Sequence, residues 1–229
     1  MNRVSGTNIT YRIVQSLGKK IVCGDFSRSE PLPSETQLCA DYGASRTVLR
    51  EAVKMLTAKG LLDARPRRGT IIRPEKEWNF TDPDIIDWLL LRKQPTDIAK
   101  EFVDFQLANI PTIGALAQPN LSSDEFVKLA KCLELIESDD LKLANEAELK
   151  FHELLLTASG NRFMVCLKHV LVAGLTACQR IRECQEVSRE QLRSDYKQIY
   201  QALMHGDEQS VRFSLSQFLM RYKLSLITL

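Results

Sequence analysis

Residues 32–56 decide the fold; they read Leu32-Pro-Ser-Glu-Thr-Gln-Leu-Cys-Ala-Asp-Tyr-Gly-Ala-Ser-Arg-Thr-Val-Leu-Arg-Glu-Ala-Val-Lys-Met-Leu56. Ser34 follows a proline and has Gln37 three residues later, a pattern that predicts a capping box at the start of a helix. Gly43 supplies a tight turn, and Ser45 can cap a second helix. Two short helices joined by a glycine-containing turn are typical of a helix-turn-helix.

The second helix of this motif has two different faces. Apolar residues recur at helical spacing on one side, at Val48, Leu49, Ala52, Val53 and Leu56. The opposite side carries Arg46, Thr47, Arg50 and Lys54. The two arginines lie one turn apart at the helix start, where free backbone N–H groups favour a phosphate. We expect a DNA-reading helix; the alternative is an amphipathic helix pair with a solvated basic face.

The flanking segments extend the motif. Ile9, Ile13, Leu17 and Ile21 predict a preceding helix over 9–23. Residues 61–65 and 70–73 predict two short strands around a basic turn, which together form a β-hairpin wing. Arg67 and Arg68 at its tip are placed to grip DNA, unless the turn is only a solvated basic loop.

Charge is distributed unevenly along the 229 residues. Residues 1–76 hold 14 Lys and Arg against 7 Asp and Glu, which leaves 17 basic and 22 acidic residues in 77–229. This asymmetry indicates that the first part meets a polyanion. We expect a domain over 1–76, a linker and connecting helix over 77–95, and a second domain over 96–229.

The second domain reads as helical throughout. The expected helices cover 96–117, 122–137, 141–158, 162–182, 188–205 and 207–225. The predicted fold class is therefore mainly α, with an N-terminal winged helix-turn-helix followed by a C-terminal all-α bundle, whose interior is a common place for small ligands.

The remaining composition excludes several classes of protein. No apolar run reaches the length that spans a bilayer, and the N-terminus lacks a signal-peptide pattern, so we expect a cytoplasmic protein without a membrane partner. The six cysteines are scattered without a Cys-x-x-Cys pair, which argues against a disulfide framework or a zinc ribbon.

The order of motifs in 9–74 resembles the winged helix of the GntR family of bacterial transcription regulators. The matching motifs are Leu-Pro-Ser-Glu at 32–35, Ser-Arg-x-x-x-Arg-Glu-Ala at 45–52, and Gly-Thr at 69–70. The resemblance implies DNA contacts by Ser45, Arg46, Thr47, Arg50 and Gly69. Thr36 stands where many members have a DNA-touching arginine, so one contact is expected to be missing.

Residues 96–229 resemble the effector domain of the FadR-type (FCD) subfamily of these regulators, most clearly over 148–161. Glu148 and His152 are an i, i+4 pair, and a carboxylate and an imidazole at that spacing can share a divalent metal. The resemblance implies two further histidine ligands on the last two helices and a metal that helps to bind a carboxylate effector. The segment 78–88 is similar to one in sugar-acid regulators, which ranks sugar acids first among the candidate effectors. For the residues themselves, we expect only two aromatic side chains that pack the joint between the domains.

This chain departs from the subfamily pattern in the expected effector site, whose candidate residues are Gln106, Glu148, His152, Tyr196 and Phe218. The two histidine positions fall on Tyr196 and Phe218, and the position of an effector-binding arginine falls on Gln106. Phenylalanine cannot coordinate a metal, and a free tyrosine has a pKa of about 10. We therefore expect the metal site to be absent or to bind Zn, Ni or Mn weakly. The alternative for His152 is a core histidine that hydrogen-bonds to Glu148.

These observations predict a transcription regulator, a repressor that binds a pseudo-palindromic operator in double-stranded DNA as a homodimer and responds to a small carboxylate metabolite. Alternatives within this class are a sensor of acyl-CoA or of another ligand bound without metal, and a regulator without small-molecule sensing. An enzyme is a weaker hypothesis, because the chain has no nucleophile motif, no phosphate-binding glycine loop and no complete metal set.

Overall fold

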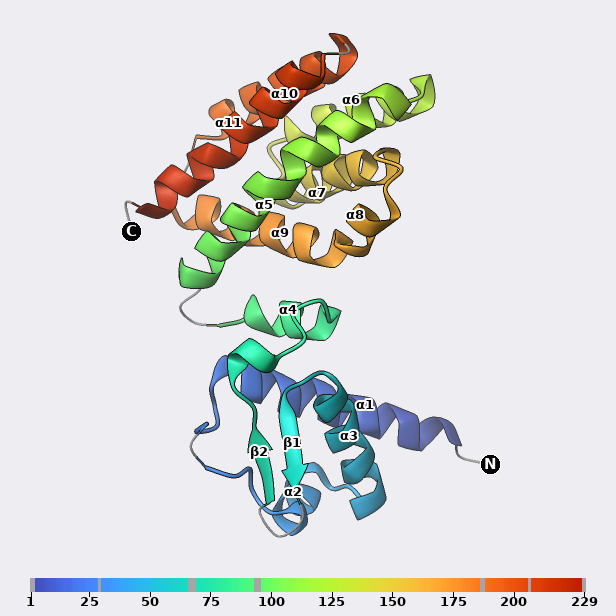
Figure 1. Cartoon of the computed structure of the whole chain (residues 1–229), viewed down its shortest axis with the longest axis vertical. Helices are drawn as coiled ribbons and strands as arrows, with labels where there is room; N and C mark the ends of the chain where they lie inside the picture. The colour runs from blue at the N-terminus through green and yellow to red at the C-terminus, as the bar shows by residue number, and fades with distance from the viewer. Residues whose placement is uncertain are drawn as a thin grey trace. The chain divides into compact units, whose positions relative to one another are not determined.

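The computed structural model describes residues 3–28, 30–65, 69–92, 96–185, 188–205 and 207–227. The chain divides into two compact units, Met1–Gln94 and Pro95–Leu229 (Figure 1). The first holds a helix-turn-helix with a two-stranded wing, and the second is a bundle of helices. The predicted fold class is thus confirmed.

The first unit is built from short elements. In chain order they are α1 (Arg3–Cys23), α2 (Glu35–Tyr42), α3 (Arg46–Ala58), β1 (Leu62–Arg65), β2 (Gly69–Ile72), the 3-10 turn η1 (Glu75–Glu77) and α4 (Pro83–Leu89). Helices α1 and α3 pack on each other and bury the apolar side of α3 at Leu49, Ala52 and Leu56.

Local capping sets the ends of α2 and α3. The Ser34 hydroxyl accepts a hydrogen bond from the Gln37 backbone N–H at 3.2 Å, but the Gln37 side chain donates to Asp41 instead of completing the capping box. Gly43 ends α2 with φ of 58°, in the left-handed region that glycine adopts without a Cβ clash. The Ser45 hydroxyl then accepts from the Val48 N–H and begins α3.

The wing is a two-stranded antiparallel sheet in which Leu62 pairs with Ile72 and Arg65 with Gly69. The segment before α2 is also hydrogen-bonded to the wing, because the Leu32 N–H donates to the Thr70 carbonyl at 2.8 Å. The strands therefore occupy nearly the predicted ranges, and the wing is tied to the chain just before α2.

Helix α4 lies in the range expected for the linker and connecting helix, and it packs against α1. Trp88 donates from Nε1 to Gln15 at 3.1 Å, and its ring covers Gly18, where an added Cβ would lie only 2.2 Å from Cη2. Lys59, which follows α3, forms ion pairs of 2.7 Å with both Asp82 and Asp84. These contacts join α4 to the winged helix.

The second unit is helical throughout its described residues. Its elements are α5 (Thr96–Ala117), η2 (Gln118–Asn120), α6 (Ser123–Ile136), α7 (Leu141–Ala158), α8 (Arg162–Cys166), α9 (Lys168–Gln185), α10 (Arg189–His205) and α11 (Glu208–Ile227). Helix α5 runs along α11 and also contacts α7 and α9, and α6 packs on α7 (Figure 1). Their shared core is aromatic and aliphatic, with Phe151, Tyr196 and Phe218 almost fully buried.

One boundary differs from the prediction. The helix expected over 162–182 is divided into α8 and α9 at Leu167, whose backbone leaves the helical region at φ −85° and ψ 0°. Asn161 caps the short α8 by accepting from two backbone N–H groups. A continuous apolar pattern runs through the break, so periodicity alone does not reveal it.

The contact between Gly18 and Trp88 leads to a stability prediction. Substitution Gly18→Ala is expected to destabilise the first unit by about 1–3 kcal/mol, because the new methyl group must displace a buried indole ring. Both tryptophans of the chain lie in this unit, so denaturant unfolding followed by tryptophan fluorescence reports on it.

The matched control is Lys19→Ala, which changes the next residue of α1, an exposed one, and should alter stability by less than about 0.5 kcal/mol. An unfolding midpoint for Gly18→Ala equal to that of Lys19→Ala would contradict the packing described for Trp88.

Candidate functional site

The first candidate surface is the exposed N-terminal part of α3. Ser45, Arg46, Thr47 and Arg50 all lie exposed there, on the side opposite the buried Leu49. Among the described residues, Arg46 forms no ion pair with a carboxylate. The structure thus brings the four predicted α3 residues onto one solvent-facing surface with the cationic side chains outward.

Arg50 is held in place by Glu35 from the first turn of α2. The Arg50 Nε lies 2.7 Å from Glu35 Oε1, and Nη2 lies 3.3 Å from Oε2, so the pair is a two-point fork. The hydrogen bond from Arg50 lowers the pKa of Glu35, which keeps the carboxylate charged. Glu35 belongs to the Leu-Pro-Ser-Glu motif, but the sequence pattern does not predict its ion pair with Arg50.

The wing contributes Gly69 at the start of β2. It is exposed, and its φ of 77° lies in the left-handed region that favours glycine. Arg67 and Arg68 lie outside the described residues, so their contacts with DNA stay a prediction. Thr36, the departure from the family motif, is exposed beside Glu35.

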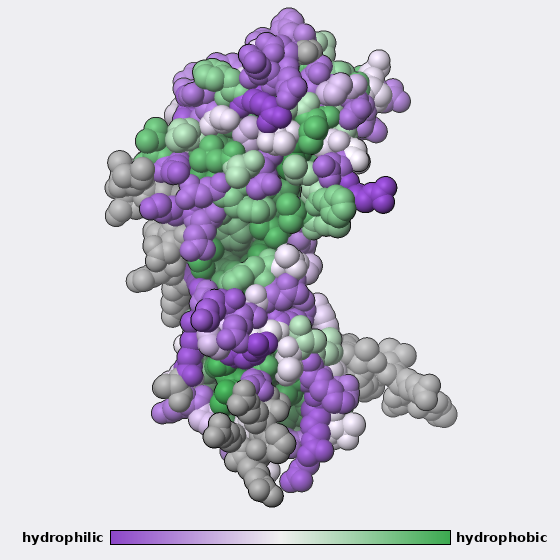
Figure 2. All heavy atoms as spheres, viewed as in Figure 1, coloured by the Kyte–Doolittle hydropathy of each residue, from purple (hydrophilic) through white to green (hydrophobic). Residues whose placement is uncertain are grey.

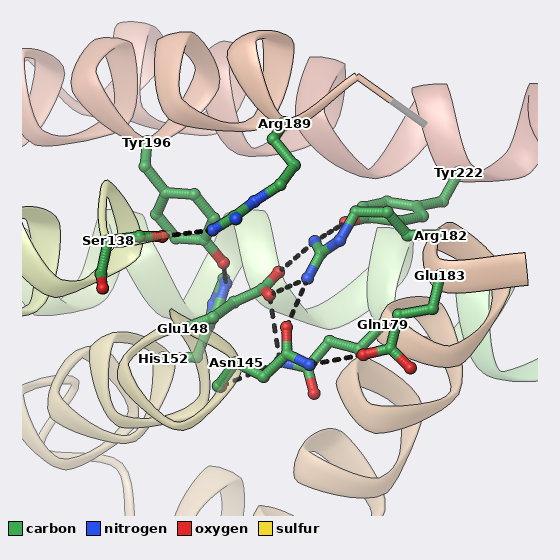
Figure 3. A network of polar contacts seen from close by, with 10 residues as sticks. All are labelled: Ser138, Asn145, Glu148, His152, Gln179, Arg182, Glu183, Arg189, Tyr196 and Tyr222. Atoms are coloured by element: carbon green, nitrogen blue, oxygen red, sulfur yellow. Dashed lines mark hydrogen bonds and ion pairs between the residues drawn. The ribbon is translucent and has the colours of Figure 1, made fainter. Parts of the chain in front are cut away.

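The second candidate site is a polar network inside the bundle, centred on Glu148 of α7. Its carboxylate accepts hydrogen bonds from Arg182 Nη2 at 2.8 Å and from Gln179 Nε2 at 3.0 Å, and both donors belong to α9 (Figure 3). Arg182 also donates to the Tyr222 hydroxyl at 2.6 Å and to Asn145 Oδ1 at 2.9 Å. Glu148 is 1% exposed and Arg182 7% exposed, so this is a buried ion pair whose partners are satisfied on several sides.

The guanidinium of Arg182 stays charged in this network. Burial by itself would lower its pKa, but the adjacent Glu148 carboxylate outweighs burial, and the pKa of Arg182 is raised. Arg182 is not predictable from the sequence, since it lies 34 positions from Glu148 and no local pattern links the two.

His152 forms a hydrogen bond with Tyr196. The alternative in which it hydrogen-bonds to Glu148 is therefore wrong. The distance from His152 Nε2 to the Tyr196 hydroxyl is 2.8 Å, and His152 Nδ1 has no partner among the described residues. Burial lowers the pKa of His152 to about 4, despite the opposing effect of Glu148. Burial together with the Glu148 charge raises the pKa of Tyr196 well above its usual value. Near neutral pH the imidazole is therefore uncharged and the phenol protonated.

The other two candidate effector residues are packed into the core. Phe218 stacks on His152 with ring centroids 6.0 Å apart and meets Tyr196 edge to face at 5.2 Å. Gln106 donates to the Leu171 carbonyl at 3.0 Å and is fully buried. The cavity that borders His152 measures about 10 Å³, room for one water molecule at most. A contact between an effector and these residues stays a prediction.

A divalent metal does not fit these residues. Phe218 offers no donor atom, and the raised pKa of Tyr196 disfavours the phenolate that a metal would need. Both Glu148 oxygens are already taken by Arg182 and Gln179. Within the described residues, no group of three or more His, Cys, Asp or Glu side chains is placed to hold a metal ion.

Two family models match the chain. The model "Bacterial regulatory proteins, gntR family" matches residues 9–72, which carry the helix-turn-helix and the wing. The model "FCD domain" matches residues 111–220, which cover most of the bundle. None of the described helices combines the length and the apolar character needed to cross a membrane.

Curated relatives align over much of the chain. The galactonate operon transcriptional repressor of Escherichia coli (strain K12) is 28% identical over 204 residues, which cover 87% of this chain and 89% of the relative. The uncharacterized HTH-type transcriptional regulator YieP of the same organism is 30% identical over 161 residues, which cover 69% of this chain and 70% of the relative.

Solved structures show the same fold. A GntR protein of Streptococcus agalactiae superposes with a TM-score of 0.52 at 20% identity and covers 94% of this chain and 99% of its own. The Lar protein, described as controlling the Listeria monocytogenes agr system, gives a TM-score of 0.56 at 21% identity and covers 95% of this chain and 96% of its own. At these identities the likeness extends to the fold alone.

The buried neutral His152 predicts a pH dependence of stability. Its pKa is about 4 in the folded protein against 6.5 for the unperturbed group. Between these values the unfolded chain binds a proton that the folded chain does not, so stability is present above pH 6.5 and falls as the pH drops toward 4. Between pH 7 and pH 5 this group should remove about 2 kcal/mol from the free energy of unfolding.

The measurement is urea unfolding followed by far-UV circular dichroism at both pH values. The matched variant is His152→Gln, which retains a hydrogen-bonding side chain but does not titrate. Wild type should lose about 2 kcal/mol more than this variant on acidification. Equal losses in the two proteins would show that His152 is accessible to protons in the folded state.

The donor set predicts little bound metal. Elemental analysis of the purified protein should find less than one divalent ion per chain, and EDTA should leave the thermal midpoint of the bundle unchanged, because Arg182 already neutralises Glu148. Stoichiometric zinc, nickel or manganese would mean that Glu148 and His152 exchange their present partners for a metal.

Proposed function

The chain belongs to the gntR family of bacterial regulatory proteins and carries its FCD domain, and from this we propose that it is the homodimeric repressor of a metabolic operon, released from its operator by a small carboxylate metabolite. The coarser function is that of a DNA-binding transcriptional regulator, in a family whose members are not enzymes. Its site of action is the bacterial chromosome in the cytoplasm.

One observation carries the DNA-binding part of the proposal, the Arg46 and Arg50 surface at the start of α3. The side chains at the start of a recognition helix reach base edges, and its free backbone N–H groups meet phosphate. Glu35 fixes the Arg50 guanidinium at two points while leaving it 67% exposed, so its remaining N–H groups point to a partner outside the chain. Such a fixed fork favours planar recognition of a guanine edge or a phosphate.

Two features support the proposed dimer, the small size of the DNA-binding helix and the apolar surface of the bundle. One 13-residue α3 helix covers few base pairs, and two copies related by symmetry read a pseudo-palindromic site. Figure 2 shows apolar surface on the bundle face where α5 runs. On the adjoining α11, Phe213, Met220 and Leu224 are exposed at spacings that place them on one side of the helix. An exposed apolar stripe of this kind favours a second copy as its partner.

The relatives support repression and a compact acid as the effector. One relative that aligns with 87% of this chain is a galactonate operon transcriptional repressor, and another, from Escherichia coli, is a putative L-lactate dehydrogenase operon regulatory protein at 29% identity over 131 residues. A third, the Glc operon transcriptional activator, shows that both outcomes occur among relatives. Acyl-CoA is the less favoured effector, because the bundle cavities lined by described residues are far smaller than an acyl chain with its nucleotide.

Release works through linkage between the two binding events. We expect the metabolite to bind more tightly to a bundle conformation in which the two DNA-binding units of the dimer have the wrong spacing for the operator. By linkage, the metabolite then lowers the affinity for the operator by the same factor by which the operator lowers the affinity for the metabolite. A coupling of about 1–3 kcal/mol changes affinity by about 5- to 150-fold, which is sufficient for induction.

The test begins with DNase footprinting upstream of the chain's own gene and the neighbouring genes. Arg46→Ala and Arg50→Ala are each expected to weaken binding to the protected site by about 10- to 100-fold, since each removes a DNA contact. Both residues are exposed, so each substitution should lower the free energy of unfolding by no more than about 1 kcal/mol.

Lys19→Ala serves as the control for charge, because Lys19 is an exposed cation of the same unit on α1 rather than α3. Wild-type affinity in both arginine variants would refute the DNA-reading role of α3. Addition of galactonate or lactate to the wild-type complex then tests release, and complexes that persist with every acid tried favour a regulator without small-molecule sensing.

A further inference from the structure

A cavity of about 190 Å³ lies beside the Glu148 network, between α7, the end of α9 and the start of α10. Its polar wall is formed by Asn145, Arg182, Glu183 and Arg189, and Leu141 and Leu192 supply apolar surface. The volume is below the range of about 300–1,000 Å³ in which drug-sized ligands bind. It therefore suits a compact metabolite and excludes a long acyl chain.

Arg189 is the free cation of this cavity. Its Nη2 donates to the Ser138 carbonyl (Figure 3), and its Nη1 donates to the Asp139 carbonyl at 3.2 Å. Among the described residues these acceptors are both neutral backbone oxygens, and no carboxylate pairs with the guanidinium. A guanidinium has five N–H donors, so three remain for a ligand.

Arg182 supplies a second guanidinium group to the lining of the same cavity. Among its contacts with the described residues, Arg182 donates two hydrogen bonds to the Glu148 carboxylate, which does not line the cavity. A third goes to the amide oxygen of Asn145, which is neutral and lines the cavity. A ligand carboxylate is a stronger acceptor than an amide oxygen and would replace Asn145 without disturbing Glu148.

The remaining polar groups select the uncharged part of the ligand. Glu183 is held by Asn145, whose Nδ2 donates to it at 2.8 Å, and its carboxylate can accept further hydrogen bonds. Hydroxyl groups on a ligand are the natural donors to this carboxylate. Because Glu148 already neutralises most of the Arg182 charge, Arg189 provides the positive charge that favours an anion, and Glu183 favours hydroxyl groups on that anion.

We propose that this cavity is the effector site and that it holds the charged group of a compact hydroxylated anion between Arg189 and Arg182. The chain's own guanidinium groups do here what a bound metal would otherwise do for an anionic ligand. This inference rests on the proposed function for its biological meaning, but binding to the cavity is measurable without DNA. Because the ligand joins α7, α9 and α10, binding should also stabilise the bundle.

The experiment measures thermal unfolding of the full chain by far-UV circular dichroism with galactonate, lactate or galactose 1-phosphate at about 10 mM, and calorimetric titration of each probe that stabilises wild type. The first two probes carry a carboxylate and the third a phosphate, so they distinguish the two possible anionic groups. Neutral galactose is the uncharged counterpart of galactonate. At least one anion should raise the midpoint of the bundle, and galactose should not.

Two variants test the site itself. Arg189→Gln should weaken binding of the active probe by about 10- to 100-fold, because it removes charged hydrogen bonds without leaving a buried carboxylate unpaired. The double variant Arg182→Gln with Glu148→Gln removes the second cation together with its buried partner and should weaken binding by a similar factor. The matched control is Arg193→Gln, one turn further along α10, where the arginine pairs with the exposed Asp139 and does not line the cavity.

Each outcome decides the proposal. Loss of binding in the two cavity variants, with wild-type affinity in Arg193→Gln, supports it. Equal affinity of wild type and both cavity variants overturns it, as does equal binding of galactose, or a wild-type bundle that no anion stabilises. Operator binding by wild type without any probe is measured separately, so failure of the proposed regulatory function is distinguished from failure of this site.

Discussion

The bundle interior depends on the buried ion pair between Glu148 and Arg182. Glu148 is 1% exposed and Arg182 is 7% exposed, so removing one partner would leave an almost buried, unpaired charge at a cost of about 3–5 kcal/mol. The pair also joins three helices, because Glu148 belongs to α7, Arg182 to α9, and the Tyr222 hydroxyl that Arg182 reaches to α11. The neutral state of His152 follows in part from the same packing, which excludes water from the aromatic cluster around it.

The Glu148–Arg182 pair determines which positive charges an anionic effector can contact in the bundle. In a metal-centred pocket the cation is loaded from outside, whereas here the positive charge is part of the chain and is present whenever the chain is folded. The charge of Arg182 is largely balanced by Glu148, so on its own it attracts an anion weakly. Arg189, bonded to two backbone carbonyls, adds the unbalanced charge, and the cavity between them is the place in the described bundle where the two effects combine.

Local patterns were sufficient to predict the helix-turn-helix, since its caps, its turn glycine and its apolar stripe all act within a few residues. The same patterns predict Arg46 and Arg50 on the exposed side of α3, where the structure has them, whereas the weakened metal site at Tyr196 and Phe218 is an expectation from the family resemblance. Sequence spacing could not reveal partners that only the fold brings together. Glu35 meets Arg50 across the turn, and Arg182 meets Glu148 across 34 residues, so both ion pairs were found only in the structure.

The two ion pairs differ in a way that suits their places in the chain. The Glu35–Arg50 pair is exposed, and such pairs contribute only about 0–1 kcal/mol, so a DNA phosphate or guanine edge can share the guanidinium at little cost. The Glu148–Arg182 pair cannot be exchanged so easily, because any ligand that drew Arg182 away would leave Glu148 buried and unpaired. An anion must therefore bind in addition to Glu148, on the side where Asn145 and Arg189 lie. The buried ion pair thus determines on which side of Arg182 an anionic effector can bind.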